Sequence, residues 1–332
     1  MDYKSKIPWF EVDKEIFKKT SNHHAYIFEG PKKIGKNLFT LEIAKGFLCN
    51  SKPNIEICNE CQSCHLFNEF NHPDFYQIKI LEEKKHISIN QIREIQEPLY
   101  ESSFLGFNKV FLINPLEKLT REAFDAFLKY LEEPPAHSIF LLVSNRYQSL
   151  PLTIKSRCIH ISMHIPETDL IKTWLKKQTK NKEKIESALL FSKGKPLVAS
   201  EMINLDVNDT RIGFIKDISE LIKTGNNLLQ ISEQWPKDNN AMLLKLEWMS
   251  DLLMDCIRHK FLTGNQETFQ DTNKISSYLS ENIETDKFFF LLEKTNSFWS
   301  LFDSETNLRA DYQLQALLAE WMECVGLARQ EI

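Results

Sequence analysis

The sequence predicts an α/β domain with a mostly parallel sheet, followed by domains that are entirely helical. Two observations lead to this fold class. In the first half of the chain, short apolar runs alternate with longer stretches of helical periodicity, which is typical of βαβ units. After about residue 165 the strand-like runs disappear, and the few glycines in this half favour long uninterrupted helices.

Three strands are expected in the first half, each continuous in apolar residues as fully buried strands tend to be. They cover residues 24–29, 108–114 and 137–144. One helix is expected over residues 38–48. Another lies between the second and third strands, where apolar residues recur at helical spacing until a proline pair ends the pattern: Phe124, Phe127, Leu128 and Leu131, then Pro134-Pro135.

These patterns divide the chain into three predicted domains, residues 1–165, 166–206 and 207–332. Pro166 marks the first boundary, and turn and N-cap residues between positions 206 and 210 mark the second. The last helix has one wide apolar face, which serves either a helical bundle or a subunit interface. Its residues are Leu314, Leu317, Leu318, Trp321, Met322 and Val325.

The composition excludes several classes of protein. The 332 residues are 42% hydrophobic and 26% charged, as in soluble globular proteins, and no apolar run reaches the roughly 18 residues that span a bilayer. The first ten residues lack the apolar core of a signal peptide, so we expect a cytoplasmic location and no membrane partner. A net charge of −5 excludes a general polyanion binder. The lysine-rich stretch 172–184 is either a local DNA-binding patch or a solvated helix face.

Four cysteines lie within sixteen residues, separated by eight, two and two residues: Cys49, Cys58, Cys61 and Cys64. In a reducing cytoplasm this spacing favours four thiolate ligands of a structural Zn²⁺ over disulfides. Four thiolates would leave no open position for catalysis by the metal. The alternative is a group of neighbouring cysteines without a metal.

A near-match to a phosphate-binding loop, residues 30–37 with the sequence GPKKIGKN, follows the first predicted strand. Gly30, Gly35 and Lys36 keep the glycine turn and the positive charge that such a loop offers to nucleotide phosphates. Asn37 stands where a Ser or Thr hydroxyl would bind Mg²⁺. Binding of ATP or ADP by this loop is therefore left open.

Hydrolysis also needs a carboxylate at the end of a buried strand and an adjacent acid that orients water. The strand that should carry them ends in Asn114 and Pro115, neither of which is acidic. Together with Asn37, these are three departures within the same chemistry. The sequence therefore predicts that the chain does not turn over ATP.

These features resemble the clamp-loader subunits of bacterial DNA polymerase III, which belong to the AAA+ superfamily. The resemblance covers residues 24 to about 163. Besides the glycine loop and the cysteines, it rests on five motifs in order: His72-Pro-Asp74, Ile89-Asn-Gln-Ile-Arg93, the strand 109–114, Leu131-Glu-Glu-Pro-Pro135 and Ser156-Arg157-Cys158. Motor subunits of this family keep an intact loop and acidic pair, whereas delta-prime subunits are degenerate there. The chain therefore resembles the delta-prime type.

The resemblance implies an AAA+ nucleotide-binding-like domain over residues 1–165 with a zinc module at about 49–64. It further implies a helical lid over 166–206 and a helical collar for oligomerisation over 207–332. The implied partners are motor and delta-type loader subunits, the sliding clamp, and primed DNA through the complex. Ser144 and Asn145 occupy the place of the residue that senses the γ-phosphate.

Arg157 is, by the same resemblance, an arginine finger that reaches the ATP of a neighbouring subunit in trans. The alternative is an arginine that caps a helix or pairs with a surface glutamate. In the same way, the carboxylates of Glu132 and Glu133 are expected to be structural or interfacial.

The leading hypothesis is a non-hydrolysing subunit of the DNA polymerase III holoenzyme, a nucleotidyltransferase complex, that supports ATP-dependent loading of the sliding clamp. One alternative is an active motor ATPase that tolerates Asn37. Another is a stand-alone zinc-dependent nucleic-acid-binding protein, suggested by the cysteines and the lysine-rich stretch.

Overall fold

The computed structural model of the chain describes residues 7–20, 23–51, 55–82, 84–105, 108–204, 207–261, 269–304 and 309–326. Two compact units divide the chain, Met1–Leu205 and Asp206–Ile332. Residues 1–6 of the N-terminal stretch and residues 205 and 206 at the predicted boundary lie outside the described residues. Among the helices described, none is both long and apolar enough to cross a membrane.

A five-stranded parallel sheet organises the first unit, which confirms the predicted parallel sheet. Its strands lie in the order β2-β3-β4-β1-β5. Their bounds are β1 Ala25–Glu29, β2 Phe75–Lys79, β3 Lys109–Asn114, β4 Ser138–Ser144 and β5 Ile159–Ser162. The three expected strands are β1, β3 and β4 in the middle of the sheet, whereas the two edge strands, β2 and β5, were not predicted.

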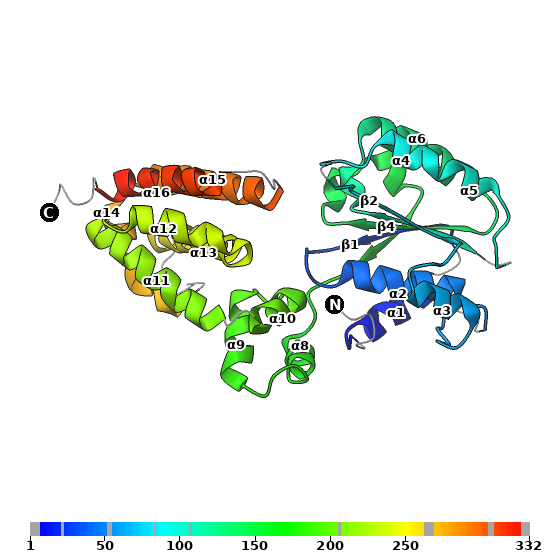
Figure 1. The fold of residues 1–332 in the computed structure, drawn as a ribbon, viewed down its shortest axis with the longest axis horizontal. Helices are drawn as coiled ribbons and strands as arrows, with labels where there is room; N and C mark the ends of the chain where they lie inside the picture. Colours follow the sequence, from blue (N-terminus) through cyan, green and yellow to red (C-terminus); the bar gives the residue numbers. More distant parts are fainter. Residues whose placement is uncertain are drawn as a thin grey trace. The chain divides into compact units, whose positions relative to one another are not determined.

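Helices cover both faces of this sheet (Figure 1). On one face lie α1 Phe10–Lys18, α2 Lys36–Leu48 and α3 Gln62–Asn68; on the other lie α4 Ile89–Glu94, α5 Gln96–Tyr100 and α6 Arg121–Glu132. Short helical turns lie at η1 Leu116–Lys118, η2 Tyr147–Ser149 and α7 Leu152–Lys155. The unit ends with three helices, α8 Thr168–Leu175, α9 Lys182–Phe191 and α10 Pro196–Asn204.

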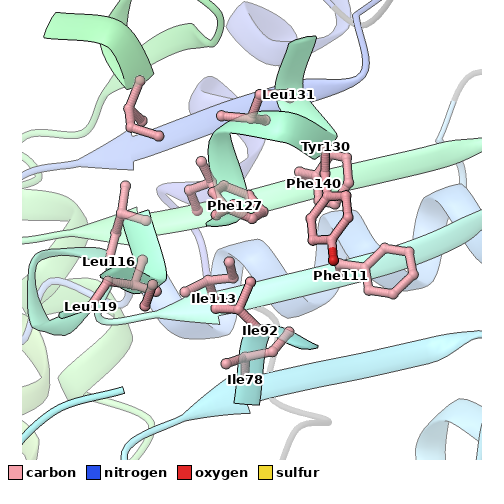
Figure 2. Close-up of a cluster of buried hydrophobic side chains, with 14 of the residues drawn as sticks. Ile78, Ile92, Phe111, Ile113, Leu116, Leu119, Phe127, Tyr130, Leu131 and Phe140 are labelled. Atoms are coloured by element: carbon pink, nitrogen blue, oxygen red, sulfur yellow. The ribbon is translucent and has the colours of Figure 1, made fainter. Parts of the chain in front are cut away.

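Alternation along the strands divides the core between the two faces of the sheet. In β3, Phe111 and Ile113 point toward α4 and α6, where they pack with Phe127 and Leu131 (Figure 2). Phe28 of β1 lies on the other face and packs against α2. Successive side chains of a strand point to opposite faces, so a strand buried on both sides must be apolar throughout.

The second unit is helical: α11 Val207–Thr224, α12 Leu228–Gln234, η3 Trp235–Lys237, α13 Asn239–Phe261, η4 Gln270–Thr272, α14 Asn273–Asn282, α15 Thr285–Ser304 and α16 Ala310–Gly326. Arg211 of α11 is buried and forms two hydrogen bonds with Asp271, of 2.7 and 2.8 Å. Its guanidinium also lies over the rings of Phe214, Trp248 and Phe269. A buried cation of this kind is tolerated because it is both paired and stacked.

Candidate functional site

The predicted phosphate loop lies between β1 and α2, at the carboxyl edge of the sheet. A Cβ atom at Gly30 would come within 2.2 Å of the carbonyl oxygen of Met163, so no larger residue fits there. Gly35 adopts a φ of 104°, a conformation that favours glycine. Gly30 and Gly35 therefore set the path of a tight loop that leads directly into a helix N-terminus.

Lys36 is turned onto the loop itself. Its side chain is only 4% exposed, and its Nζ donates hydrogen bonds to the carbonyl oxygens of Gly30 at 2.7 Å and Pro31 at 2.6 Å. Burial lowers the pKa of Lys36 to about 8, and the negative charges of Glu117 and Glu29 partly offset this decrease. The ammonium group that would bind phosphate thus already has acceptors within the loop.

The two asparagines at the positions where Mg²⁺ ligands were expected form a hydrogen bond with each other. Nδ2 of Asn114, the last residue of β3, donates a 2.9 Å hydrogen bond to Oδ1 of Asn37, the second residue of α2. In a competent site a hydroxyl and a carboxylate at these positions would hold Mg²⁺. Here two neutral amides are joined directly, and Pro115 beside them carries no acid.

Two further segments cover the outside of the loop. Nε1 of Trp9 donates to the carbonyl oxygen of Ile34 at 3.2 Å. The backbone N–H of Leu197 in α10 donates to the carbonyl oxygen of Lys33 at 3.3 Å. Lys33 also forms a 3.1 Å ion pair with Glu201 of α10. The loop is therefore fastened from both the N-terminal segment and the last helix of the first unit, and sequence reasoning identified neither Trp9 nor α10 as part of the site.

Asn145, which the sequence placed at the sensor position, is held by Glu117. The carboxylate of Glu117 accepts hydrogen bonds from the backbone N–H and the Nδ2 of Asn145, at 3.1 and 3.0 Å. Ser144 is buried, and its Oγ accepts from the backbone N–H of Arg146. Sequence reasoning missed Glu117, although an acid two residues after Pro115 was a signal that could have been followed.

The four cysteines predicted as metal ligands come together at the end of α2 and the start of α3. Their sulfur atoms all lie within 4.8 Å of one another, and the sulfurs of Cys58 and Cys64 are 3.8 Å apart. Four sulfurs at about 2.3 Å from one Zn²⁺ would be about 3.8 Å apart. The donor set fits Zn²⁺, with Cys49, Cys58, Cys61 and Cys64 as the residues that could hold it.

Backbone N–H groups favour thiolates in this cluster. Those of Glu60 and Cys61 donate to the sulfur of Cys58 at 3.4 and 3.3 Å, and that of Cys64 donates to the sulfur of Cys61 at 3.4 Å. These donors lower the pKa of Cys58 to about 6. Burial raises the pKa of Cys64, and a cation in the cluster would oppose that effect.

A buried hydrogen-bond chain connects the cysteine cluster to the sheet. Oγ of Ser63 donates to the carbonyl oxygen of Leu48 at 2.5 Å and lies 2.8 Å from Nε2 of His72. Nδ1 of His72 accepts from the backbone N–H of Asp74 at 3.0 Å, so this network requires the neutral tautomer with a proton on Nε2. Burial correspondingly lowers the pKa of His72. The His72-Pro-Asp74 motif thus fixes the cysteine cluster next to the start of β2.

Arg157 lies on the surface, between α7 and β5, with 34% of its side chain exposed. Its Nη1 donates to the carbonyl oxygen of Thr153 at 2.9 Å and to Oγ of Ser156 at 3.3 Å. Its Nη2 is 2.8 Å from Oε1 of Glu132, the last residue of α6. The guanidinium therefore caps α7 and pairs with a glutamate, while part of it faces solvent.

The sequence matches two family models. The family described as DNA polymerase III, delta subunit, matches residues 9–167, and the one described as DNA polymerase III, delta subunit, C terminal, matches residues 207–323.

Individual relatives agree with these matches. DNA polymerase III subunit delta' of Buchnera aphidicola (subsp. Acyrthosiphon pisum) is 32% identical over 267 residues, which cover 80% of this chain and 81% of the relative. The protein of the same name from Pseudomonas aeruginosa is 27% identical over 324 residues, covering 96% and 98%. DNA polymerase III subunit tau/gamma of Haemophilus influenzae is 35% identical over 141 residues, covering 42% of this chain and 20% of that relative.

Removal of one cysteine tests the metal site. We expect about one zinc ion per purified chain, and we expect Cys61→Ser to lower that content, because the remaining three thiolates hold the ion less tightly. Metal analysis by atomic emission measures this. Cys324→Ser, which changes a cysteine of the second unit, is the matched control and should retain its zinc. Equal zinc content in Cys61→Ser and the unchanged chain would contradict the site.

The burial of Lys36 has a consequence for stability at alkaline pH. The folded chain releases the proton of Lys36 near pH 8, whereas the unfolded chain keeps it up to about pH 10.5. Between these values the unfolded state binds more protons, so the free energy of unfolding of the unchanged chain rises with pH relative to Lys36→Met, by at most about 1.4 kcal/mol per pH unit.

Urea unfolding of both chains across this pH window measures the difference. Lys32→Met, which removes an exposed lysine of the same loop, serves as the control. If the difference between the unchanged chain and Lys36→Met does not vary with pH, the ammonium group is not buried as described.

Proposed function

The chain belongs to the family of DNA polymerase III delta' subunits, and from this premise we propose that it is a non-hydrolysing subunit of the clamp loader. In this role it supports ATP-dependent loading of the sliding clamp onto primed DNA. It lends Arg157 to the ATP site of a neighbouring subunit and does no ATP chemistry of its own.

One observation carries the first half of the proposal, the hydrogen bond between Asn114 and Asn37. Magnesium prefers charged or hydroxyl oxygens around an octahedron and gives up its water reluctantly. The two amides, which are hydrogen-bonded to each other, offer the ion no negative charge. The ammonium group of Lys36 donates hydrogen bonds to carbonyl oxygens of its own loop. Without the metal and an acid at position 115, neither the charge on the phosphates nor the attacking water is positioned for hydrolysis.

Strand topology supports the second half. Ile159, two residues after Arg157, pairs with Tyr26 near the start of β1, whereas the phosphate loop begins at Gly30 after the end of β1. At about 3.3 Å per residue, four residues place the two ends roughly 13 Å apart along the strand. Arg157 therefore lies at the edge of the sheet opposite its own loop, which supports a role at the nucleotide of another subunit.

The cysteine cluster has a structural role in this proposal. Four thiolates complete the tetrahedral sphere of Zn²⁺, so the metal would add folding free energy without binding substrate. Sites of this kind contribute on the order of 10 to 16 kcal/mol to the folding of small lobes. The module at residues 49–64 has too little apolar core of its own, and the metal would replace that core.

The remaining assignments follow the family. We propose residues 1–165 as the AAA+ domain, 166–206 as a lid and 207–332 as a collar that meets other loader subunits. The proposed partners are motor and delta-type subunits and the sliding clamp, with primed DNA reached through the complex in the cytoplasm. A stretch that covers 42% of this chain is similar to a tau/gamma subunit, and this similarity supports a ring built from related subunits.

Two alternatives from the sequence find less support. A motor ATPase would need the amides of Asn37 and Asn114 to separate and to bind Mg²⁺ that two uncharged oxygens hold weakly. For a stand-alone nucleic-acid binder, the lysine-rich stretch 172–184 would have to overcome a net charge of −5.

The purified chain should show no ATPase activity above background, because its metal position is closed. A coupled phosphate-release assay with the isolated chain measures this. Steady turnover that disappears in Lys36→Ala would mean that the loop is catalytic, and the proposal would fail.

Replacement of Arg157 tests the trans assignment. Arg157→Ala should assemble with its loader partners yet slow hydrolysis at the adjoining ATP site by about 10³-fold or more, since arginine fingers contribute 10³ to 10⁵ in rate. Gel filtration and single-turnover hydrolysis by the reconstituted loader measure the two effects. Arg146→Ala, which removes an exposed arginine nearby in the chain, is the control. Normal hydrolysis with Arg157→Ala would rule out the finger.

A further inference from the structure

Glu132 has an unfavourable position unless a cation accompanies it. It is the last residue of α6, where the partial negative charge of the helix C-terminus repels a carboxylate. Pro134 and Pro135 follow Glu133 and cannot extend the helix, so α6 ends at Glu132. The guanidinium of Arg157, 2.8 Å away, supplies the missing cation.

The contact with Glu132 uses Nη2 of Arg157, a nitrogen that takes part in two-pronged phosphate recognition. A guanidinium binds a phosphate with two parallel N–H donors, either Nη1 with Nη2 or Nε with Nη2. Nη2 takes part in both arrangements, and in this structure it is paired with Oε1 of Glu132. Nη1 is directed to Thr153 and Ser156. Nη2 carries two N–H groups and the ion pair uses one of them, so a negative oxygen that approaches Nη2 competes with the carboxylate of Glu132 for the guanidinium.

We propose that Glu132 is a latch for Arg157, a positioning residue that holds the guanidinium in a carboxylate pair and releases it to the triphosphate of the neighbouring subunit. This inference rests on the proposed function, because it assigns the regulation of the same trans site. The carboxylate takes the place of the phosphate while the neighbouring site holds no ATP. ATP in that site competes with the carboxylate for the guanidinium, so the latch raises the ATP concentration that the site needs.

The latch is weak enough to be reversible. The side chains of Arg157 and Glu132 are 34% and 51% exposed, so water and salt screen their attraction. Half-exposed ion pairs of this kind change an equilibrium by about two- to five-fold. A phosphate, with more negative charge and a second acceptor oxygen, outcompetes one carboxylate oxygen.

Glu132→Gln tests the latch in the reconstituted loader. The phosphate-loop lysine of the other motor subunits is replaced with alanine, so that only the ATP site facing this chain turns over. Single-turnover hydrolysis then gives the ATP concentration for half-maximal rate and the maximal rate. We expect Glu132→Gln to lower the half-maximal concentration about two- to five-fold and to leave the maximal rate unchanged. Release from a latch favours ground state and transition state equally.

Two controls separate the latch from other roles. Glu133→Gln removes the adjacent exposed carboxylate and should behave as the unchanged chain. In a chain that already carries Arg157→Ala, Glu132→Gln should have no effect, because the latch acts only through the guanidinium. Thermal unfolding and gel filtration establish that each variant is folded and assembled.

Every other outcome overturns the proposal in a recognisable way. A lower maximal rate in Glu132→Gln would mean that the carboxylate orients the finger for catalysis, and an unchanged half-maximal concentration would mean that it does not restrain it. An effect of Glu132→Gln that persists with Arg157→Ala would mean a structural role in α6. If Arg157→Ala itself leaves hydrolysis unchanged, the trans site of the proposed function fails, and the latch fails with it.

Discussion

The parallel sheet is the constraint on which the rest of the first unit depends. Because all five strands run the same way, the residues that follow β1, β3 and β4 meet at one edge of the sheet. This arrangement brings the phosphate loop, Asn114 and Asn145 together from distant parts of the sequence. The residues that precede the strands, including Arg157 before β5, are placed at the opposite edge. One topology thus separates the phosphate-loop residues from Arg157.

At the carboxyl edge, groups that would contact a nucleotide contact each other. Lys36 binds carbonyls of its own loop, Asn114 binds Asn37, and Asn145 binds Glu117. A typical intramolecular hydrogen bond adds only about 0.5 to 1.5 kcal/mol net, but leaving a buried polar group unpaired costs about 1 to 3 kcal/mol. Internal partners therefore keep this edge of the sheet stable without a ligand.

The sequence predicted the parts of the fold that burial determines. β1, β3 and β4 are covered on both faces, so they are continuous apolar runs that can be recognised in the sequence. The edge strands were missed because they are partly exposed; β5, for example, alternates Ile159 and Ile161 with the exposed His160 and Ser162. Such runs differ little from loops in composition. Whether a strand lies at an edge depends on the whole sheet and cannot be inferred from the sequence of that strand alone.

The candidate site shows the same division. The spacing of the cysteines sufficed to predict their cluster, since nearby positions in the chain are nearby in space. Asn37 and Asn114 were each recognised as poor metal ligands, but their hydrogen bond spans 77 residues and depends on the strand order. For Arg157, the sequence allowed a pair with a surface glutamate as the alternative interpretation, but it did not identify Glu132, on a different helix, as the partner. Sequence spacing cannot give contacts that only the completed sheet creates.

We propose that this chain's own phosphate loop does not bind magnesium–ATP and that Arg157 acts at the ATP site of another subunit. Titration of the isolated chain with a fluorescent ATP analogue, with and without Mg²⁺, tests it most directly. We expect no saturable binding that depends on Mg²⁺, because the side chains of Asn37 and Asn114 are hydrogen-bonded to each other. Saturable, Mg²⁺-dependent binding that is lost in Lys36→Ala would contradict it.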